Sequence, residues 1–158
     1  MASMMGLAWP RQVRGLYLVA SALFVITAVI GIVNGLDLVD FSPENTAMRP
    51  TLLTHVHAGT LGWITLALIA IAVWLFKSGD GRLAWAFGIL IPIYVAAFYS
   101  GNLPARAITG TLLLVAILWL FVWVWRQALG ARSLPALAVA LGLTSFTYGA
   151  VIGVLIQV

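Results

Sequence analysis

The two histidines of this chain are the residues that most clearly indicate chemistry, and the sequence contains no further histidine. His55 and His57 lie two residues apart in the run THVHAGTLGW, residues 54–63. An imidazole can donate or accept a hydrogen bond, bind a metal ion or ligate a heme iron. The pair therefore predicts either two structural histidines with hydrogen-bond partners or a cofactor site.

Helical geometry limits how the two imidazoles can act together. Residues i and i+2 lie about 200° apart around a regular helix, so one such helix cannot aim both rings at one ion. Either the rings serve different partners, or the first turn after Pro50 is irregular. His55 shares a face with Gly59 and Gly62, a lane without side chains along which a flat macrocycle or a neighbouring helix could lie.

The composition excludes a soluble globular domain around this pair. Of 158 residues, only eight are Lys or Arg and four are Asp or Glu, whereas 63% are hydrophobic. Soluble domains are about 25% charged. The net charge of +4 is spread thinly, so no nucleic-acid partner is expected. There is no cysteine, which excludes disulfides, thiolate metal sites and cysteine nucleophiles.

Five apolar segments are long enough to cross a membrane as helices, which takes about 20 residues each. We expect an all-α fold, a single transmembrane domain over residues 1–158. Its five helices are expected at about Gly15 to Gly35, Thr51 to Phe76, Leu83 to Ser100, Ala107 to Trp125 and Leu134 to Ile156.

The basic residues predict the orientation. Six of them flank one set of span ends: Arg11, Arg14, Lys77, Arg82, Arg126 and Arg132. Only Arg49 and Arg106 flank the other ends. Because cytoplasmic loops are enriched in Lys and Arg, we expect a multi-pass protein of a bacterial-type inner (cytoplasmic) membrane. Its N-terminus would be cytoplasmic, its C-terminus external, and both histidines would lie near the external surface.

Small residues follow helical spacing in the last span, namely Gly142, Ser145, Gly149 and Gly153. Such residues let two membrane helices approach closely. They predict either packing within the same bundle or the seam of a homo-oligomer.

The histidine run, followed by an apolar helix that ends in Trp74-Leu75-Phe76, resembles the second transmembrane helix of the heme-copper oxidase catalytic subunit. The similarity is to the cbb-type oxidase and nitric oxide reductase branch and to short relatives with a His-x-His-x-x-x-x-Gly-Trp stretch. The resemblance implies that His57 occupies the position of a low-spin heme ligand. His55 would be the additional upstream histidine of the short relatives.

Other polar groups are expected near a heme at this level. Arg49 and Arg106 lie where they could neutralise heme propionates, or they extend to the interface as membrane arginines often do. Two further sets of polar residues are expected to bond either to imidazoles or propionates or to other helices. The first set is Tyr94, Tyr99, Ser100 and Asn102; the second is Thr144, Ser145, Thr147 and Tyr148.

The chain also departs from the family. It lacks the later helices, the second low-spin heme ligand and the histidines that hold copper, so it cannot be a complete oxidase or reductase, and we assign no catalytic residue. The resemblance predicts a membrane heme- or metal-binding protein for electron transfer, gas sensing or support of a respiratory complex. Heme b is the first expectation and copper or another metal ion the second. The expected partners are the lipid bilayer and either a second copy of the chain or respiratory-complex subunits.

Two other functional classes remain open. The chain could be a cofactor-free structural or accessory subunit whose histidines only form hydrogen bonds. It could also be a small-molecule binder or transporter, because its Trp-rich five-helix layout resembles the translocator protein family. The Trp-x-Pro-Pro signature of that family is absent.

Overall fold

A computed structural model describes residues 10–39, 48–77 and 81–157, with side chains described for 10–36, 51–77 and 81–152. This part of the chain is helical apart from short turns and contains no strand, which confirms the all-α class. The elements are α1 (Arg11–Val39), α2 (Met48–His57), η1 (Ala58–Ile64), α3 (Thr65–Leu75), α4 (Arg82–Tyr99), α5 (Leu103–Ala131) and α6 (Leu134–Gln157).

The prediction of five spans is confirmed. Elements α2, η1 and α3 follow one another without a break, and five helices among the described residues are long and apolar enough to cross a membrane. The fourth helix is longer than expected. It begins at Leu103 because the Asn102 side chain caps it, accepting a hydrogen bond from the Ala105 amide at 3.0 Å. It ends at Ala131, before Arg132 in the left-handed region.

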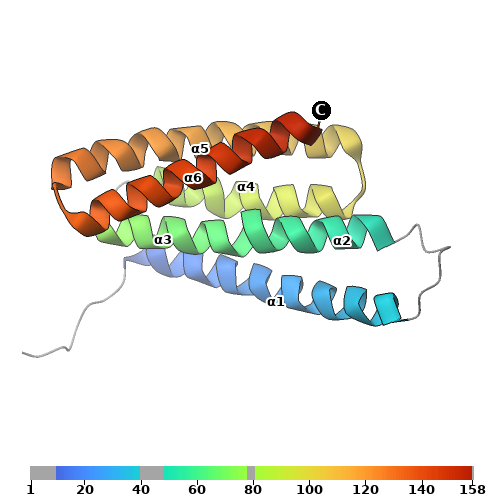
Figure 1. Cartoon of the computed structure of the whole chain (residues 1–158). Coiled ribbons are helices and arrows are strands. Elements are labelled where there is room, and N and C mark those ends of the chain that lie inside the picture. The colour runs from blue at the N-terminus through green and yellow to red at the C-terminus, as the bar shows by residue number, and fades with distance from the viewer. Residues whose placement is uncertain (1–9, 40–47, 78–80, 158) are drawn as a thin grey trace, which may run out of the picture.

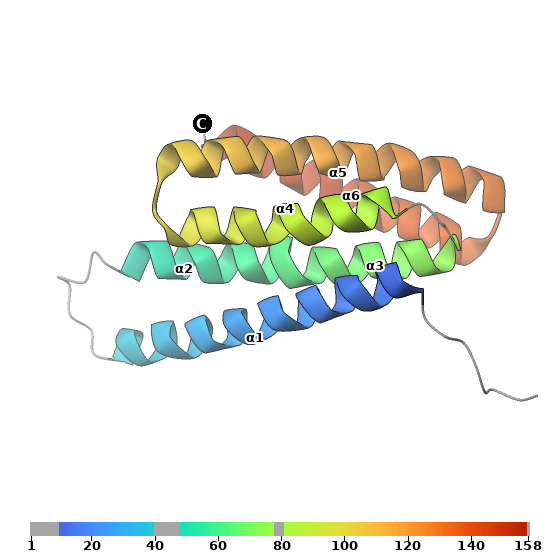
Figure 2. The ribbon, with the colours of Figure 1, turned by 180° about the vertical axis from the view of Figure 1, so that it is seen from behind.

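Successive helices lie antiparallel and side by side (Figures 1 and 2). Helix α1 forms one edge of the bundle and packs against α2, η1, α3 and α4. Helix α4 contacts α2 and α3 on one side and α5 on the other, and α6 packs mainly on α5. This meander follows from short connections, which keep consecutive spans adjacent.

Apolar side chains occupy both the interior and the outer surface. Phe87, Ile91 and Leu66 are completely buried between the helices. Large apolar residues are also exposed along the helices, including Leu18, Ile32, Trp85, Val115, Leu129 and Leu141. A helix that is apolar all round is suited to lipid contact. The fold is therefore that of a multi-pass membrane protein.

The two ends of the bundle differ in chemistry. The basic end carries Arg11, Arg14, Lys77, Arg82, Arg126 and Arg132, since α1, α4 and α6 begin there and α3 and α5 end there (Figure 1). The histidine end carries His55, His57 and Arg106. The separation that the charge count predicted is thus present in the fold. The placement of the basic end in the cytoplasm stays a prediction.

The small residues of α6 face outward. Gly142 and Gly149 are exposed, and a Cβ atom added to either would meet nothing within 4 Å. Ser145 is exposed too. The exposure of Gly153 lies outside what the structure describes. Packing inside the bundle therefore does not explain Gly142 and Gly149, whereas the homo-oligomer seam stays a prediction.

Candidate functional site

The two imidazoles diverge onto different neighbouring helices. Helix α2 remains regular as far as His57, so the rings project in different directions, as the i, i+2 spacing requires. His55 bonds to α1 and His57 bonds to α4. Of the two geometric alternatives, different partners or an irregular first turn, the structure shows that the two rings bond to different partners.

His55 forms a hydrogen bond whose direction is unambiguous. Its Nδ1 atom lies 2.9 Å from the carbonyl oxygen of Thr27. A carbonyl can only accept, so Nδ1 donates and must carry the proton. In the neutral ring the lone pair then resides on Nε2. His55 forms no other hydrogen bond with the described residues.

Gly31 makes room for this ring. A Cβ atom at position 31 would lie 2.6 Å from Cε1 and 3.0 Å from Nδ1 of His55. Real Cβ atoms do not approach other atoms so closely, so any larger residue would push the imidazole away from the Thr27 carbonyl. Thr27 and Gly31 are four residues apart on α1 and share one face.

Asn34 continues that face of α1 by one further turn. Its side chain is only 4% exposed, and neither its amide nitrogen nor its amide oxygen has a hydrogen-bond partner among the described residues. Buried polar groups are nearly always paired, so this unpaired amide is an exception among the polar side chains near His55 and could bond to a polar ligand group. Sequence reasoning missed Thr27, Gly31 and Asn34 because all three belong to another span. Asn34 could have been noticed as the one amide in the first predicted span.

His57 has a different environment on α4. Its Nδ1 atom lies 2.6 Å from the hydroxyl oxygen of Tyr94, and its ring stacks on Phe98 with centroids 3.8 Å apart and planes inclined by 30°. A hydroxyl can donate or accept, so this bond leaves the tautomer of His57 open. Tyr94 therefore bonds an imidazole, and because this bond joins α4 to α2 it is also a bond between helices; the structure shows both expected kinds of bond in one contact.

Arg106 forms the next layer on Phe98. Its Nη2 atom donates to the Phe98 carbonyl oxygen at 2.7 Å, and its guanidinium carbon lies 5.0 Å from the centre of the Phe98 ring. Its Nε atom is buried and has no partner among the described residues. Arg106 is therefore partly buried next to the stack instead of extending freely to water, and it brings a positive charge close to His57.

The glycine lane lies on a widened helix. Residues 58–64 form a π-helix, an arrangement with i to i+5 bonding that is rare and often occurs at functional sites. A Cβ atom on Gly59 would touch Thr27 of α1, and one on Gly62 would touch Leu23 of α1 and Val95 of α4. Both contacts would be at ordinary van der Waals distance, 3.6–3.7 Å, so an alanine would fit at either position. The lane nevertheless faces α1 and α4, which is the neighbouring-helix interpretation of the lane.

The remaining predicted residues lie apart from the imidazoles. Ser100 and Asn102 bond at the turn between α4 and α5, and Tyr99 is 62% exposed. Thr144 accepts a hydrogen bond from the Trp125 indole, between α5 and α6. The Thr147 hydroxyl is buried without a partner in the described part, whereas Ser145 and Tyr148 are exposed. Arg49 belongs to the first turn of α2, and its side chain lies outside the described residues.

Within the described ranges, no three His, Cys, Asp or Glu side chains lie close enough together to hold a metal ion. Comparison with known proteins adds no assignment. No family model, no curated protein and no solved structure matches this chain.

Proposed function

We propose that this membrane protein binds heme b, with Nε2 of His55 as an axial ligand of the iron. Its work would be electron transfer, gas sensing or support of a respiratory complex. The observation that carries the proposal is the hydrogen bond from Nδ1 of His55 to the Thr27 carbonyl oxygen. The resemblance to the heme-copper oxidase helix supports the same class of cofactor.

The His55 environment fits an axial ligand. Histidines that bind metals almost always donate their other ring N–H to a carbonyl, a carboxylate or water, which fixes the tautomer and the ring orientation. The Thr27 carbonyl has this relation to His55, and Gly31 provides the space for it. A porphyrin supplies four nitrogen ligands itself, so a single imidazole can be enough to hold heme iron.

Unpartnered donors at the same end of the bundle fit the acidic groups of heme. The Asn34 amide and the Arg106 Nε–H are both buried without partners in the described part of the chain. Propionate carboxylates accept hydrogen bonds, and bonds from a guanidinium to a carboxylate are among the stronger ones. Either residue could receive a propionate.

When bound, heme would supply one-electron transfer or the binding of a diatomic gas, depending on its axial ligation. The residues of the chain would position the ring of His55, exclude water with the apolar helix faces and balance charge through Arg106. A copper or other metal ion at the same Nε2 atom is the second cofactor proposal, and it would need further ligands.

The role of His57 follows from its separate partner. Because the two rings point to different helices, they would not ligate one iron from one chain. The family resemblance assigns the ligand role to His57, which requires Nδ1 to donate to the Tyr94 hydroxyl oxygen. We propose that His55 is the ligand and that His57 fixes α2 to α4.

The experiment is a heme titration of the full-length chain, purified in detergent without added heme. We expect a saturable Soret band at one heme per chain that sharpens on reduction with dithionite. The double variant His55→Gln/His57→Gln is expected to leave only the spectrum of free heme. An identical titration for the double variant would contradict the proposal. So would a chain purified from its native membrane with neither a Soret band nor bound metal.

A cofactor-free structural subunit is the second candidate function. It is favoured by one fact, namely that each imidazole already has a hydrogen-bond partner in the bundle. In that case the double variant would associate with the same membrane partners as the natural chain. Co-purification from cross-linked membranes would measure this.

A further inference from the structure

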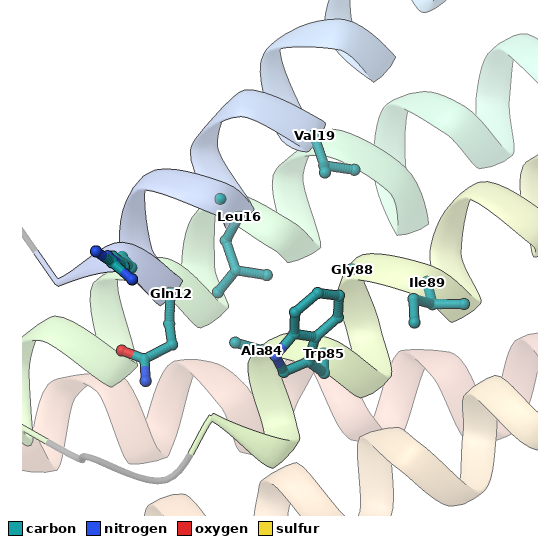
Figure 3. Close-up of a pocket in the computed structure, with 9 residues that line it drawn as sticks. Gln12, Leu16, Val19, Ala84, Trp85, Gly88 and Ile89 are labelled. Atoms are coloured by element: carbon teal, nitrogen blue, oxygen red, sulfur yellow. The ribbon is translucent and has the colours of Figure 1, made fainter.

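A cavity of about 400 Å³ lies between α1 and α4 at the basic end, far from the histidines (Figure 3). Sites for small molecules typically enclose about 300–1,000 Å³. The figure shows Gln12 and Leu16 of α1 pointing toward Ala84 and Trp85 of α4, with the cavity between the two helices.

Missing side chains create the apolar part of this cavity. Gly15 of α1 and Gly88 of α4 both line it, and a Cβ atom on either would meet nothing within 4 Å. Leu16 is buried at its inner side, whereas Trp85 is 70% exposed and Ile89 is 54% exposed. The cavity therefore opens at the outer surface of the bundle, where the apolar helices contact lipid.

The other part of the cavity is polar and positive. Arg11 and Gln12 line it, and none of its lining residues is acidic. The Gln12 amide nitrogen lies 3.4 Å from the place where a Cβ atom of Gly81 would be, so its side chain rests against the residue that precedes α4. Gly81 is the N-cap of α4 and itself provides no capping side chain. The first backbone N–H groups of a helix have no partner within the helix, and together with the helix dipole they favour an anion at its N-terminus.

We propose that this cavity binds an anionic phospholipid. Its phosphate would contact Arg11, Gln12 and the N-terminus of α4, and one acyl chain would lie along the groove that Gly15 and Gly88 leave open. A small soluble anion would use the polar part alone and leave the apolar groove exposed. An anionic amphiphile matches both parts of the lining, its charge facing Arg11 and its apolar chain facing the groove. This inference does not depend on heme binding.

The predicted membrane orientation agrees with this ligand. The basic end is expected to face the cytoplasm, and the cytoplasmic leaflet is the one with a negative surface potential. Six of the eight Lys and Arg residues of the chain lie at this end. Arg11 differs from the others in that it lines the cavity.

The test measures lipids retained by the full-length chain, using native mass spectrometry. The protein is exchanged into detergent containing equal amounts of phosphatidylglycerol and phosphatidylcholine with the same acyl chains. We expect one phosphatidylglycerol per chain to be retained preferentially. The variant Gly88→Leu places a side chain in the groove, and its Cβ atom meets nothing within 4 Å. It is expected to lose the preferential retention.

The variant Arg11→Gln tests the polar part. We expect retention of phosphatidylglycerol to fall about fivefold, because the phosphate loses its charged contact inside the cavity. The matched controls are Arg14→Gln, on the same helix but outside the lining, and Gly142→Leu, an exposed glycine on α6. Both controls should retain phosphatidylglycerol as the natural chain does.

Several results would overturn the inference. Equal retention of the two lipids would show that no anionic headgroup is recognised. Unchanged retention in both Gly88→Leu and Arg11→Gln would place the bound lipid elsewhere. Complete displacement by millimolar inorganic phosphate, or preferential retention of a neutral isoprenoid quinone, would assign the cavity to a different ligand.

Discussion

His55 and His57 are the same residue type and only two residues apart, yet they bond to different kinds of partner atom on α1 and α4. The partner of His55 is a backbone carbonyl, which can only accept a hydrogen bond. The partner of His57 is the Tyr94 hydroxyl, which can accept or donate. The ring of His55 lies against a glycine, whereas the ring of His57 stacks on Phe98.

This difference determines which imidazole is ready to act as a Lewis base. An acceptor-only partner forces the proton onto Nδ1 and leaves the lone pair on Nε2. A hydroxyl partner permits either tautomer of His57. Its Nδ1 can accept from the Tyr94 hydroxyl while Nε2 carries the proton, so this bond does not require a lone pair on Nε2. A family motif can identify a histidine pair, but the partner atom decides the role of each ring. The following predictions test this contrast, in order of expected effect.

Replacement of the ligand should have the largest effect. We expect His55→Gln to weaken heme binding more than about 100-fold. Loss of an outer-shell partner typically costs about 10–100-fold, and loss of the ligand itself should cost more. His57→Gln, its matched control, should change the affinity less than tenfold. Soret titrations of both single variants measure this. A larger loss in His57→Gln than in His55→Gln would reverse the assignment and support the family position of the ligand.

Displacement of the ring should have the next largest effect. The methyl group of Gly31→Ala would collide with the imidazole of His55, so the bond to Thr27 should break or lengthen. We expect heme affinity to fall about 10–100-fold, as for loss of an outer-shell partner. Gly35→Ala is the control, because a Cβ atom there meets nothing within 4 Å. Equal heme affinities in the two variants would mean that the Thr27 bond does not position the ligand.

Removal of the orphaned amide should stabilise the chain before heme is added. Asn34→Leu replaces a buried polar group that has no partner in the described structure, so the free energy of unfolding should rise by about 1–3 kcal/mol. Asn102→Leu is the contrasting variant. It removes the cap of α5 and should cost about 1 kcal/mol.

Denaturant titration in detergent, followed by circular dichroism, measures both free energies. If Asn34→Leu destabilised the heme-free chain as Asn102→Leu does, the Asn34 amide would have a partner in the protein, and it would not be the group that receives a propionate.

Loss of the tyrosine hydroxyl should have the smallest effect. Tyr94→Phe removes the bond to His57 but keeps the ring packing, so unfolding should become easier by about 0.5–1.5 kcal/mol. Heme affinity should stay within about a factor of two of that of the natural chain, because His57 is not the proposed ligand. Thermal unfolding and a Soret titration provide the two readouts. Tyr99→Phe, at an exposed tyrosine, is the control and should change neither. Strong loss of heme in Tyr94→Phe would make His57 the ligand.

The sequence predicted the spans because their cause is local. A run of apolar residues of bilayer length must be helical in lipid, and no distant residue is needed to decide this. The divergence of the two imidazoles was predictable for the same reason, since the helical repeat alone sets it. Helix ends were less accurate. Asn102 extends α5 beyond its apolar stretch by capping it, which hydropathy does not detect.

The partners of the histidines could not be predicted from the sequence in the same way. Thr27 contributes a backbone carbonyl, and this atom is present in every residue. Gly31 is one of 15 glycines, and only its position opposite His55 gives it a role. The π-helix after His57 was not predicted either; it packs against α1 and α4, and these neighbours cannot be read from the local sequence. Tyr94 was predicted only as one member of a group of polar residues.

Heme ligation by His55 depends on the position of a single proton, which ¹⁵N NMR of the imidazoles can locate. The chain has two histidines, so the spectrum of ¹⁵N-histidine-labelled protein can be assigned by comparison with His57→Gln. We expect Nδ1 of His55 to carry the proton, shown by its one-bond coupling to hydrogen. We also expect the Nε2 signal of His55 to change more than that of His57 when heme is added. A proton on Nε2 of His55, or an Nε2 signal that heme leaves unaltered, would contradict ligation by His55.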